Sequence, residues 1–144
     1  MLAVRLDPVE ALARLAFHDH AILCTLHPER GVDAVPVVYV VDEDGFVGVP
    51  IDRVKPKASL RLQRQRNLEL DPRATLLGEH WDPSDWTQLW WVRAELRWQP
   101  DPADRESSLA AQLARRYPQY REQPFAQVLV LRILGLTGWA ARTD

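Results

Sequence analysis

The chain has 144 residues, of which 47% are hydrophobic and 26% are charged, and its net charge is −2. These values are typical of a soluble globular protein, and we expect one domain over residues 1–144. The single cysteine, Cys24, excludes an intrachain disulfide. The sequence contains no run of about 18 uncharged apolar residues, so no membrane span is predicted. From both observations we expect a cytoplasmic protein.

The first part of the sequence predicts one helix and three strands. Asp7 and Pro8 are typical of a helix start, and a helix is expected to follow them. The apolar residues expected on one face of this helix are Val9, Leu12, Ala13 and Ala16. Two short apolar runs at 20–27 and 32–42, separated by a turn, predict a hairpin, and a third strand is expected at 46–52.

The second part of the sequence predicts two helices and three strands. A helix is expected from Pro56 to about Leu70, because proline suits the first helical position. Strands are expected at 73–81, 87–99 and 126–141, with a helix between the last two that ends at Pro118. Together these elements predict a mainly β protein with a closed or nearly closed six-stranded antiparallel barrel.

The tryptophan-rich strand at 87–99 alternates between two kinds of residue. One face is expected in the core and carries Trp90, Val92, Ala94, Leu96 and Trp98. The opposite face is amphipathic and carries Leu89, Trp91, Arg93, Glu95 and Arg97. Such a mixed face suits an interface or the wall of a ligand site.

Residues 53–66 contain six basic residues and no acidic one, although the whole chain is slightly acidic. With Pro56 as the first helical residue, Lys55 and Lys57 would flank a helix N-terminus, and Ser59 would add a hydroxyl group. The unpaired N–H groups of a helix N-terminus attract phosphate and carboxylate groups. Two interpretations stay open, namely an anion site and a solvated basic helix face. A nucleic-acid surface is disfavoured because the rest of the chain is acidic.

Several short motifs follow one another along nearly the whole chain. They are "AVPVVY", "VPID", "KPK", "RNLELDP", "LWWVRAEL", "RYPQYRE" and a terminal "GW". In this order they resemble the split β-barrel flavin and deazaflavin oxidoreductases, and most of all the pyridoxamine 5′-phosphate oxidase-like group that uses the deazaflavin coenzyme F420. The resemblance implies an FMN-binding type of split barrel, a homodimer with the cofactor groove at its interface, and hydride transfer to a small electron-poor substrate.

The resemblance also implies which residues bind the cofactor. Lys55, Lys57 and Ser59 match the phosphate-holding stretch, and Asn67 matches the asparagine that closes the following helix. The segments that match the walls around the ring system are Val35, Pro36 and Val37 together with Val49, Pro50 and Ile51. Trp91 and Arg93 match a strand expected near the dimer interface. Two positions depart from the family pattern: Ala58 replaces an arginine, and Asp33 or Ala34 replaces a histidine of the first hairpin.

Two alternatives keep the same fold. In one, FMN replaces F420 and the protein is a flavin reductase or oxidase. In the other, a non-catalytic barrel carries a cofactor or haem, and the histidines to inspect are His18, His20 and His80. No catalytic acid or base is predicted, since Tyr39 would serve as a proton donor only if it faced the pocket. No metal site is predicted, because these histidines and Glu79 form no recognised ligand pattern.

Overall fold

The computed structural model describes residues 2–53, 62–102 and 104–142. The helices in this part of the chain are α1 (Pro8–Phe17), α2 (Gln63–Leu70) and α3 (Asp104–Arg116). The strands are β1 (Leu2–Arg5), β2 (Ala21–His27), β3 (Gly31–Val37), β4 (Val40–Val41), β5 (Phe46–Asp52), β6 (Arg73–His80), β7 (Trp90–Trp98) and β8 (Phe125–Arg142). Two short 3-10 helices, η1 (Trp86–Gln88) and η2 (Pro118–Tyr120), lie in the connections.

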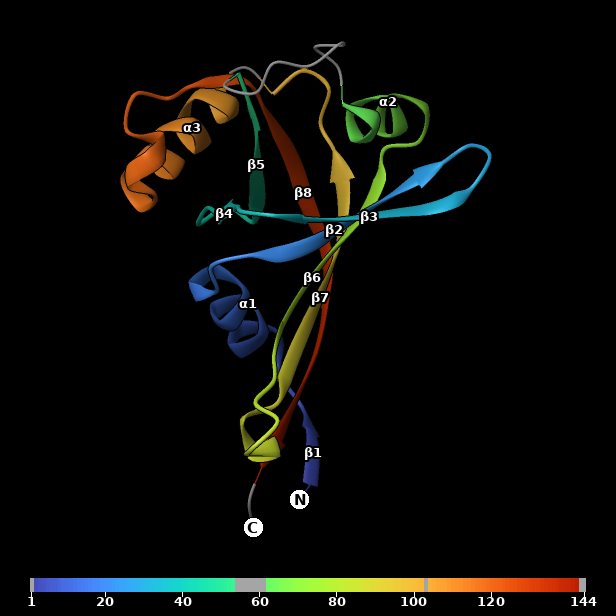
Figure 1. Ribbon diagram of the computed structural model, residues 1–144, viewed down its shortest axis with the longest axis vertical. Coiled ribbons are helices and arrows are strands. Elements are labelled where there is room, and N and C mark those ends of the chain that lie inside the picture. Colours follow the sequence, from blue (N-terminus) through green and yellow to red (C-terminus); the bar gives the residue numbers. More distant parts are fainter. Residues whose placement is uncertain (1, 54–61, 103, 143–144) are drawn as a thin grey trace.

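All strands belong to one antiparallel sheet, in the order β3-β2-β6-β7-β8-β5-β4, with β1 paired to the end of β8. β3 and β4 lie at opposite ends of this order but are joined by only Val38 and Tyr39. The chain itself therefore links the two edges, and the sheet curls into a barrel (Figure 1). The predicted mainly β split barrel is confirmed. The described strands outnumber the six predicted ones because one predicted strand is interrupted and β1 is added.

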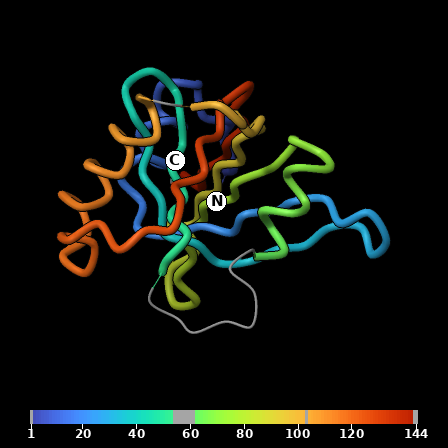
Figure 2. Tube along the Cα trace, turned by 90° about the horizontal axis from the view of Figure 1, so that it is seen from above, coloured from blue at the N-terminus to red at the C-terminus, as the bar shows by residue number. Residues whose placement is uncertain are grey.

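The helices pack at three places around the sheet. α1 packs on β7 and β8, α3 packs on β5 and β8, and α2 packs on β2. Figures 1 and 2 both place α2 beside the β2–β3 hairpin, on the other side of the molecule from α3. α3 approaches β5 closely at Gly48, where a Cβ atom would lie 2.9 Å from Leu109 Cβ. Glycine is required there because Leu109 Cβ is fixed to the helix backbone and cannot move aside.

The core confirms the alternation predicted for β7. Val92 and Ala94 are fully buried and Leu96 is nearly so, while the flanking Trp90 and Trp98 pack partly buried against the same core. The fully buried residues of β8, Leu129 and Leu131, face the same interior. The predicted start of α1 is also confirmed, since Asp7 Oδ1 accepts a hydrogen bond of 3.0 Å from the Glu10 N–H.

The predicted face of α1 is correct only in part, because Leu12 and Ala16 pack partly buried against the core whereas Val9 and Ala13 are exposed. Val9 is 80% exposed, and the buried residues of α1 are Ala11 and Leu15. The buried face is therefore shifted around the helix from the predicted one and overlaps it, because its position depends on where β7 and β8 lie.

The predicted strand at 32–42 is interrupted at Tyr39. The Tyr39 side chain is fully buried, and its hydroxyl donates a 2.5 Å hydrogen bond to the carbonyl of Leu15 at the end of α1. The Tyr39 carbonyl accepts a hydrogen bond from the Tyr117 hydroxyl at 3.2 Å. The Tyr39 carbonyl thus has a side-chain partner in place of a neighbouring strand, at the point where the chain turns between β3 and β4.

The second helix begins later than predicted within the described residues. Leu62 has extended backbone angles, and α2 starts at Gln63. The Leu62 N–H donates a 2.6 Å hydrogen bond to Gln65 Oε1, which fixes this start. The predicted start at Pro56 lies outside the described residues. In the part of the chain that is described, no helix is long and apolar enough to cross a membrane.

Candidate functional site

Two adjoining clefts lie where α2 begins beside β3 and β5. One has a volume of about 260 Å³ and is lined by Pro36, Val37, Val38, Pro50, Asp52, Leu62, Arg64 and Tyr120. The other has a volume of about 220 Å³ and is lined by Thr25, Arg30, Asp33, Ala34, Val35, Leu62, Gln63 and Arg64. Because both are bounded by Leu62 and Arg64, we treat them as one site and call it the α2 groove.

The α2 groove contains part of the predicted set of cofactor residues. Val35, Pro36 and Val37 on β3 and Pro50 on β5 contribute to its walls. Val49 and Ile51 do not, because each is at most 1% exposed and both pack in the core. Alternation along β5 explains this division, since neighbouring strand residues point to opposite faces. The predicted phosphate-holding residues Lys55, Lys57 and Ser59 lie outside the described residues.

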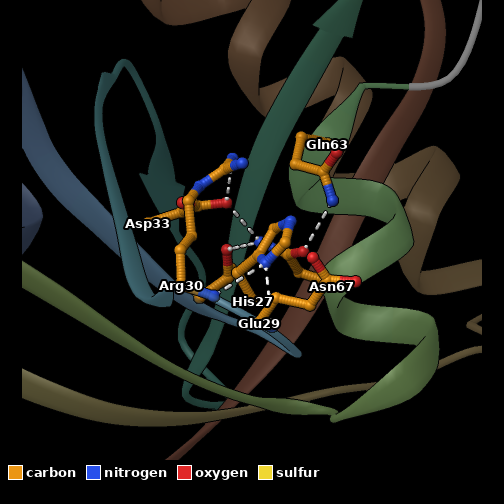
Figure 3. A network of polar contacts seen from close by, with 7 residues as sticks. His27, Glu29, Arg30, Asp33, Gln63 and Asn67 are labelled. Atoms are coloured by element: carbon orange, nitrogen blue, oxygen red, sulfur yellow. Dashed lines mark hydrogen bonds and ion pairs between the residues drawn. The ribbon is translucent and has the colours of Figure 1, made fainter.

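Asn67 holds α2 against the β2–β3 hairpin. Its side chain is fully buried, and its Nδ2 group donates hydrogen bonds to Thr25 Oγ1 at 3.0 Å and to Asp33 Oδ2 at 2.8 Å. Its Oδ1 accepts a 2.9 Å hydrogen bond from Gln63 Nε2 (Figure 3). Both N–H groups and the oxygen of the side-chain amide therefore have protein partners, which favours the structural one of the two roles expected for this residue.

The hairpin end of this network carries a bidentate ion pair. Arg30 donates to both oxygens of Asp33, at 2.7 Å and 3.0 Å. Figure 3 shows Arg30 and Asp33 on the hairpin facing Asn67 on α2. The pKa of Asp33 is lowered, first by the hydrogen bond from Arg30 and then by that from Asn67. Asp33 thus anchors the hairpin to α2.

Sequence reasoning missed a charged group in the α2 groove formed by Asp52, Arg64 and Tyr120. The Tyr120 hydroxyl lies 3.4 Å from Asp52 Oδ2, whereas Asp52 Oδ1 and Arg64 Nε are buried without a hydrogen-bond partner. Burial lowers the pKa of Arg64, and the Asp52 carboxylate opposes that shift. Burial, followed by Asp52, raises the pKa of Tyr120 to about 12. In the sequence, Arg64 belongs to the basic stretch, Asp52 to the motif "VPID" and Tyr120 to the motif "RYPQYRE", but nothing there indicates that the three lie together.

Trp91 and Arg93 line a different cleft, on the face of the sheet that was predicted to be amphipathic. It has a volume of about 560 Å³ and is lined by Cys24, Thr75, Leu77, Glu79, Leu89, Trp91 and Arg93. The Arg93 guanidinium lies 5.5 Å from the Trp91 ring centre, within the range of a cation–π contact. These two residues are therefore not brought together with the α2 groove within one chain.

The surroundings of Tyr39 do not suit a catalytic proton donor. Tyr39 faces the core and donates to a backbone carbonyl, and burial raises its pKa, so it does not act as a proton donor in the α2 groove. Among the residues that the structure describes, no three His, Cys, Asp or Glu side chains are grouped to hold a metal ion.

No protein-family model matches the sequence, and neither does any curated protein. Solved structures do match its fold. An FAD-binding protein from Mesorhizobium loti is 15% identical, with 99% of each chain covered and a TM-score of 0.71. The fold is that of a split β-barrel.

Two more structures share this split barrel. The haem storage protein of Vibrio cholerae is 16% identical, covers 92% of this chain and 94% of its own, and has a TM-score of 0.63. A candidate pyridoxamine 5′-phosphate oxidase from Corynebacterium glutamicum is 13% identical, covers 99% and 96%, and has a TM-score of 0.56. At these identities the likeness establishes the fold, which in these proteins accompanies three different ligands or activities.

Proposed function

We propose that the protein is an oxidoreductase that binds a flavin-type cofactor with its ring system in the α2 groove. The observation that carries this proposal is the composition of the groove walls. Pro36, Val37 and Pro50 come together there from two strands, and they belong to the segments that the sequence resemblance assigns to the ring. The FAD-binding protein of the same fold supports a flavin-type ligand.

For the cofactor itself we propose F420, with FMN as the second candidate. The order of the sequence motifs supports F420, whereas the similar structure described as FAD-binding supports a flavin. Either cofactor carries an anionic arm, for which Lys55, Lys57 and Ser59 are the proposed partners. The substrate would be a small electron-poor molecule that lies against the exposed face of the ring.

The groove residues suit the positioning of a ring better than the transfer of protons. When bound, the cofactor supplies hydride chemistry. The aliphatic walls would hold the ring and exclude water from it. Tyr120, with its pKa raised to about 12, keeps its proton at neutral pH, and its hydroxyl acts there as a hydrogen-bonding group. We propose no side chain of this chain as an acid–base catalyst.

Titration with F420, FMN and FAD tests this function. Six tryptophans make intrinsic fluorescence a sensitive readout. We expect quenching by F420 with a dissociation constant in the micromolar range, near −8 kcal/mol, and weaker quenching by the two flavins. Tighter binding of FMN would leave the oxidoreductase proposal intact and replace its cofactor. If none of the three binds, the proposal is wrong.

A haem-binding role is the second candidate, and the split barrel of a haem storage protein favours it. His18 packs edge-on against Trp90, with ring centres 4.9 Å apart, and lies 5.2 Å from His20. Burial, followed by the charge of His20, lowers the pKa of His18, which favours the neutral imidazole that binds iron. A Soret band on addition of hemin that is lost in His18→Ala would support this role over the flavin-type one.

We propose further that the protein is a homodimer, with the Trp91 cleft at the interface. The cleft places Leu77, Leu89 and Trp91 beside charged groups, the mixture typical of an interface with an apolar centre and a polar rim.

The Trp91→Glu variant tests this assembly. A buried charge at an aromatic interface anchor is expected to weaken association by roughly 2 kcal/mol or more, about thirtyfold. Light scattering coupled to size exclusion would then show a monomer where the wild type shows a dimer. Trp86→Glu is the matched control, because Trp86 is 57% exposed on η1 and lies outside the cleft. A monomeric wild type, or a dimeric Trp91→Glu variant, would contradict the proposed interface.

A further inference from the structure

Arg64 and Asp52 both line the first of the two clefts of the α2 groove, and each carries a side-chain atom that has no hydrogen-bond partner. Arg64 Nε is buried without a hydrogen-bond partner, although Asp52 is close enough to affect the pKa of the guanidinium. Asp52 contacts the Tyr120 hydroxyl through Oδ2, and its Oδ1 has no partner. One donor atom and one acceptor atom of two residues that line the same cleft are thus buried without a partner. Such groups are rare in proteins, because each loses its hydrogen bonds to water on burial.

The electrostatics of the groove indicate what could satisfy both groups. A phosphate or carboxylate would be attracted by Arg64 and repelled by Asp52. A cation would be attracted by Asp52 and repelled by Arg64. A neutral group that accepts one hydrogen bond and donates another satisfies both residues without adding charge. The remaining walls are aliphatic, from Pro36, Val37, Val38, Pro50 and Leu62. Such walls suit a flat ring system.

We propose that Arg64 and Asp52 bind the edge of a heterocycle in which a carbonyl group lies next to a ring N–H. Arg64 donates to the carbonyl oxygen and Asp52 accepts from the N–H. This inference rests on the proposed function, because the pyrimidinedione ring of flavins and deazaflavins has this edge. The inference also specifies the orientation of the bound ring, whose pyrimidinedione end would point toward α2 and Tyr120. It also makes Arg64 and Asp52 specificity-determining residues.

The volume of the groove agrees with this assignment. Ligand pockets commonly measure about 300–1,000 Å³, and the cleft that holds Asp52 measures about 260 Å³. That cleft therefore suits one end of a cofactor, and the rest of the molecule extends beyond it. The adjoining cleft, which is bounded by the same Arg64, continues toward the β2–β3 hairpin.

The test combines two variants with one modified ligand. Asp52→Asn replaces one carboxylate oxygen with a donor, and Arg64→Gln removes the guanidinium. Fluorescence titration with FMN and with F420 is expected to give at least tenfold weaker binding in each variant. The N3-methylated form of whichever cofactor binds lacks the ring N–H. It is expected to bind the wild type at least tenfold more weakly than the parent cofactor, and Asp52→Asn should not weaken it further. Arg121→Gln, an exposed arginine directly after Tyr120, is the matched control and should bind as the wild type does.

The outcomes separate this inference from the proposed function. If the wild type binds a cofactor and neither the two variants nor N3-methylation changes its affinity, the Arg64–Asp52 site is wrong and the oxidoreductase proposal stands. If the wild type binds no cofactor, both fail. Should a variant lose its cooperative thermal unfolding, the comparison of parent and N3-methylated cofactor on the wild type decides. A full tenfold difference supports the site, and equal affinities overturn it.

Discussion

Replacement of both Lys55 and Lys57 by alanine is expected to weaken cofactor binding by about 3–6 kcal/mol. Each lysine would lose a charge-assisted hydrogen bond to the anionic arm of the cofactor, and such bonds contribute about 1.5–3 kcal/mol each. The measurement is a fluorescence titration with F420 and FMN at fixed ionic strength. In the wild type the affinity should also fall as salt is added, and this dependence should be smaller in the double variant.

Two controls make this result specific. The double variant Arg5→Ala, Arg142→Ala removes the same charge from exposed positions on β1 and β8, whose ends lie together far from α2 (Figure 1). It should bind as the wild type does. Riboflavin lacks the phosphate group of FMN, so the lysine variant should bind riboflavin as the wild type does. An unchanged affinity for FMN or F420 in the lysine variant would remove the assigned anion site.

The second large effect is expected for Asn67→Ala, which should lower the free energy of unfolding by about 2–4 kcal/mol. The change leaves the buried Thr25 hydroxyl and one oxygen of Asp33 without their hydrogen bonds from Asn67. An unsatisfied buried polar group costs about 1–3 kcal/mol, and the side chain also leaves a small cavity. Urea denaturation monitored by tryptophan fluorescence gives the difference.

Leu70→Ala on the same helix is the control for Asn67→Ala. Leu70 is 70% exposed, and its replacement is expected to change stability by less than about 0.5 kcal/mol. A double-mutant cycle with Thr25→Ala should give a coupling free energy of about 1 kcal/mol or more, since the two side chains are in direct contact. If Asn67→Ala is as stable as the wild type, the network does not hold α2 in place.

Patterns that are complete within a short segment were predicted well. The alternation of β7 and the Asp7–Pro8 start of α1 both follow from neighbouring residues, and both are confirmed. Patterns that depend on a partner far away in the sequence were not predicted well. The buried face of α1 is chosen by β7 and β8, and β1 is a strand only because the end of β8 lies beside it. Nothing in the four residues of β1 indicates a partner near the other end of the chain.

The candidate site follows the same rule. Pro36, Val37 and Pro50 line the groove as the sequence motifs implied, because each belongs to a strand segment that the motifs identify. Asp52, Arg64 and Tyr120 come from three different elements, and only the folded chain brings them together. The unpartnered side-chain atoms of Asp52 and Arg64, on which the inferred recognition of a ring edge depends, have no sequence signature at all.

β8 is the longest described strand, and it pairs with β1, β5 and β7, all of which precede it in the sequence. During synthesis, these three partners leave the ribosome before the strand that they require. The first pair of the β1–β8 ladder joins Leu2 to Arg142, so the ladder closes nearly the whole chain into a loop. Contacts between such distant residues form slowly. A nascent chain would therefore expose unpaired strand edges until β8 has been synthesised, and deletion of a few residues within β8 should promote aggregation more than an equal deletion in a loop.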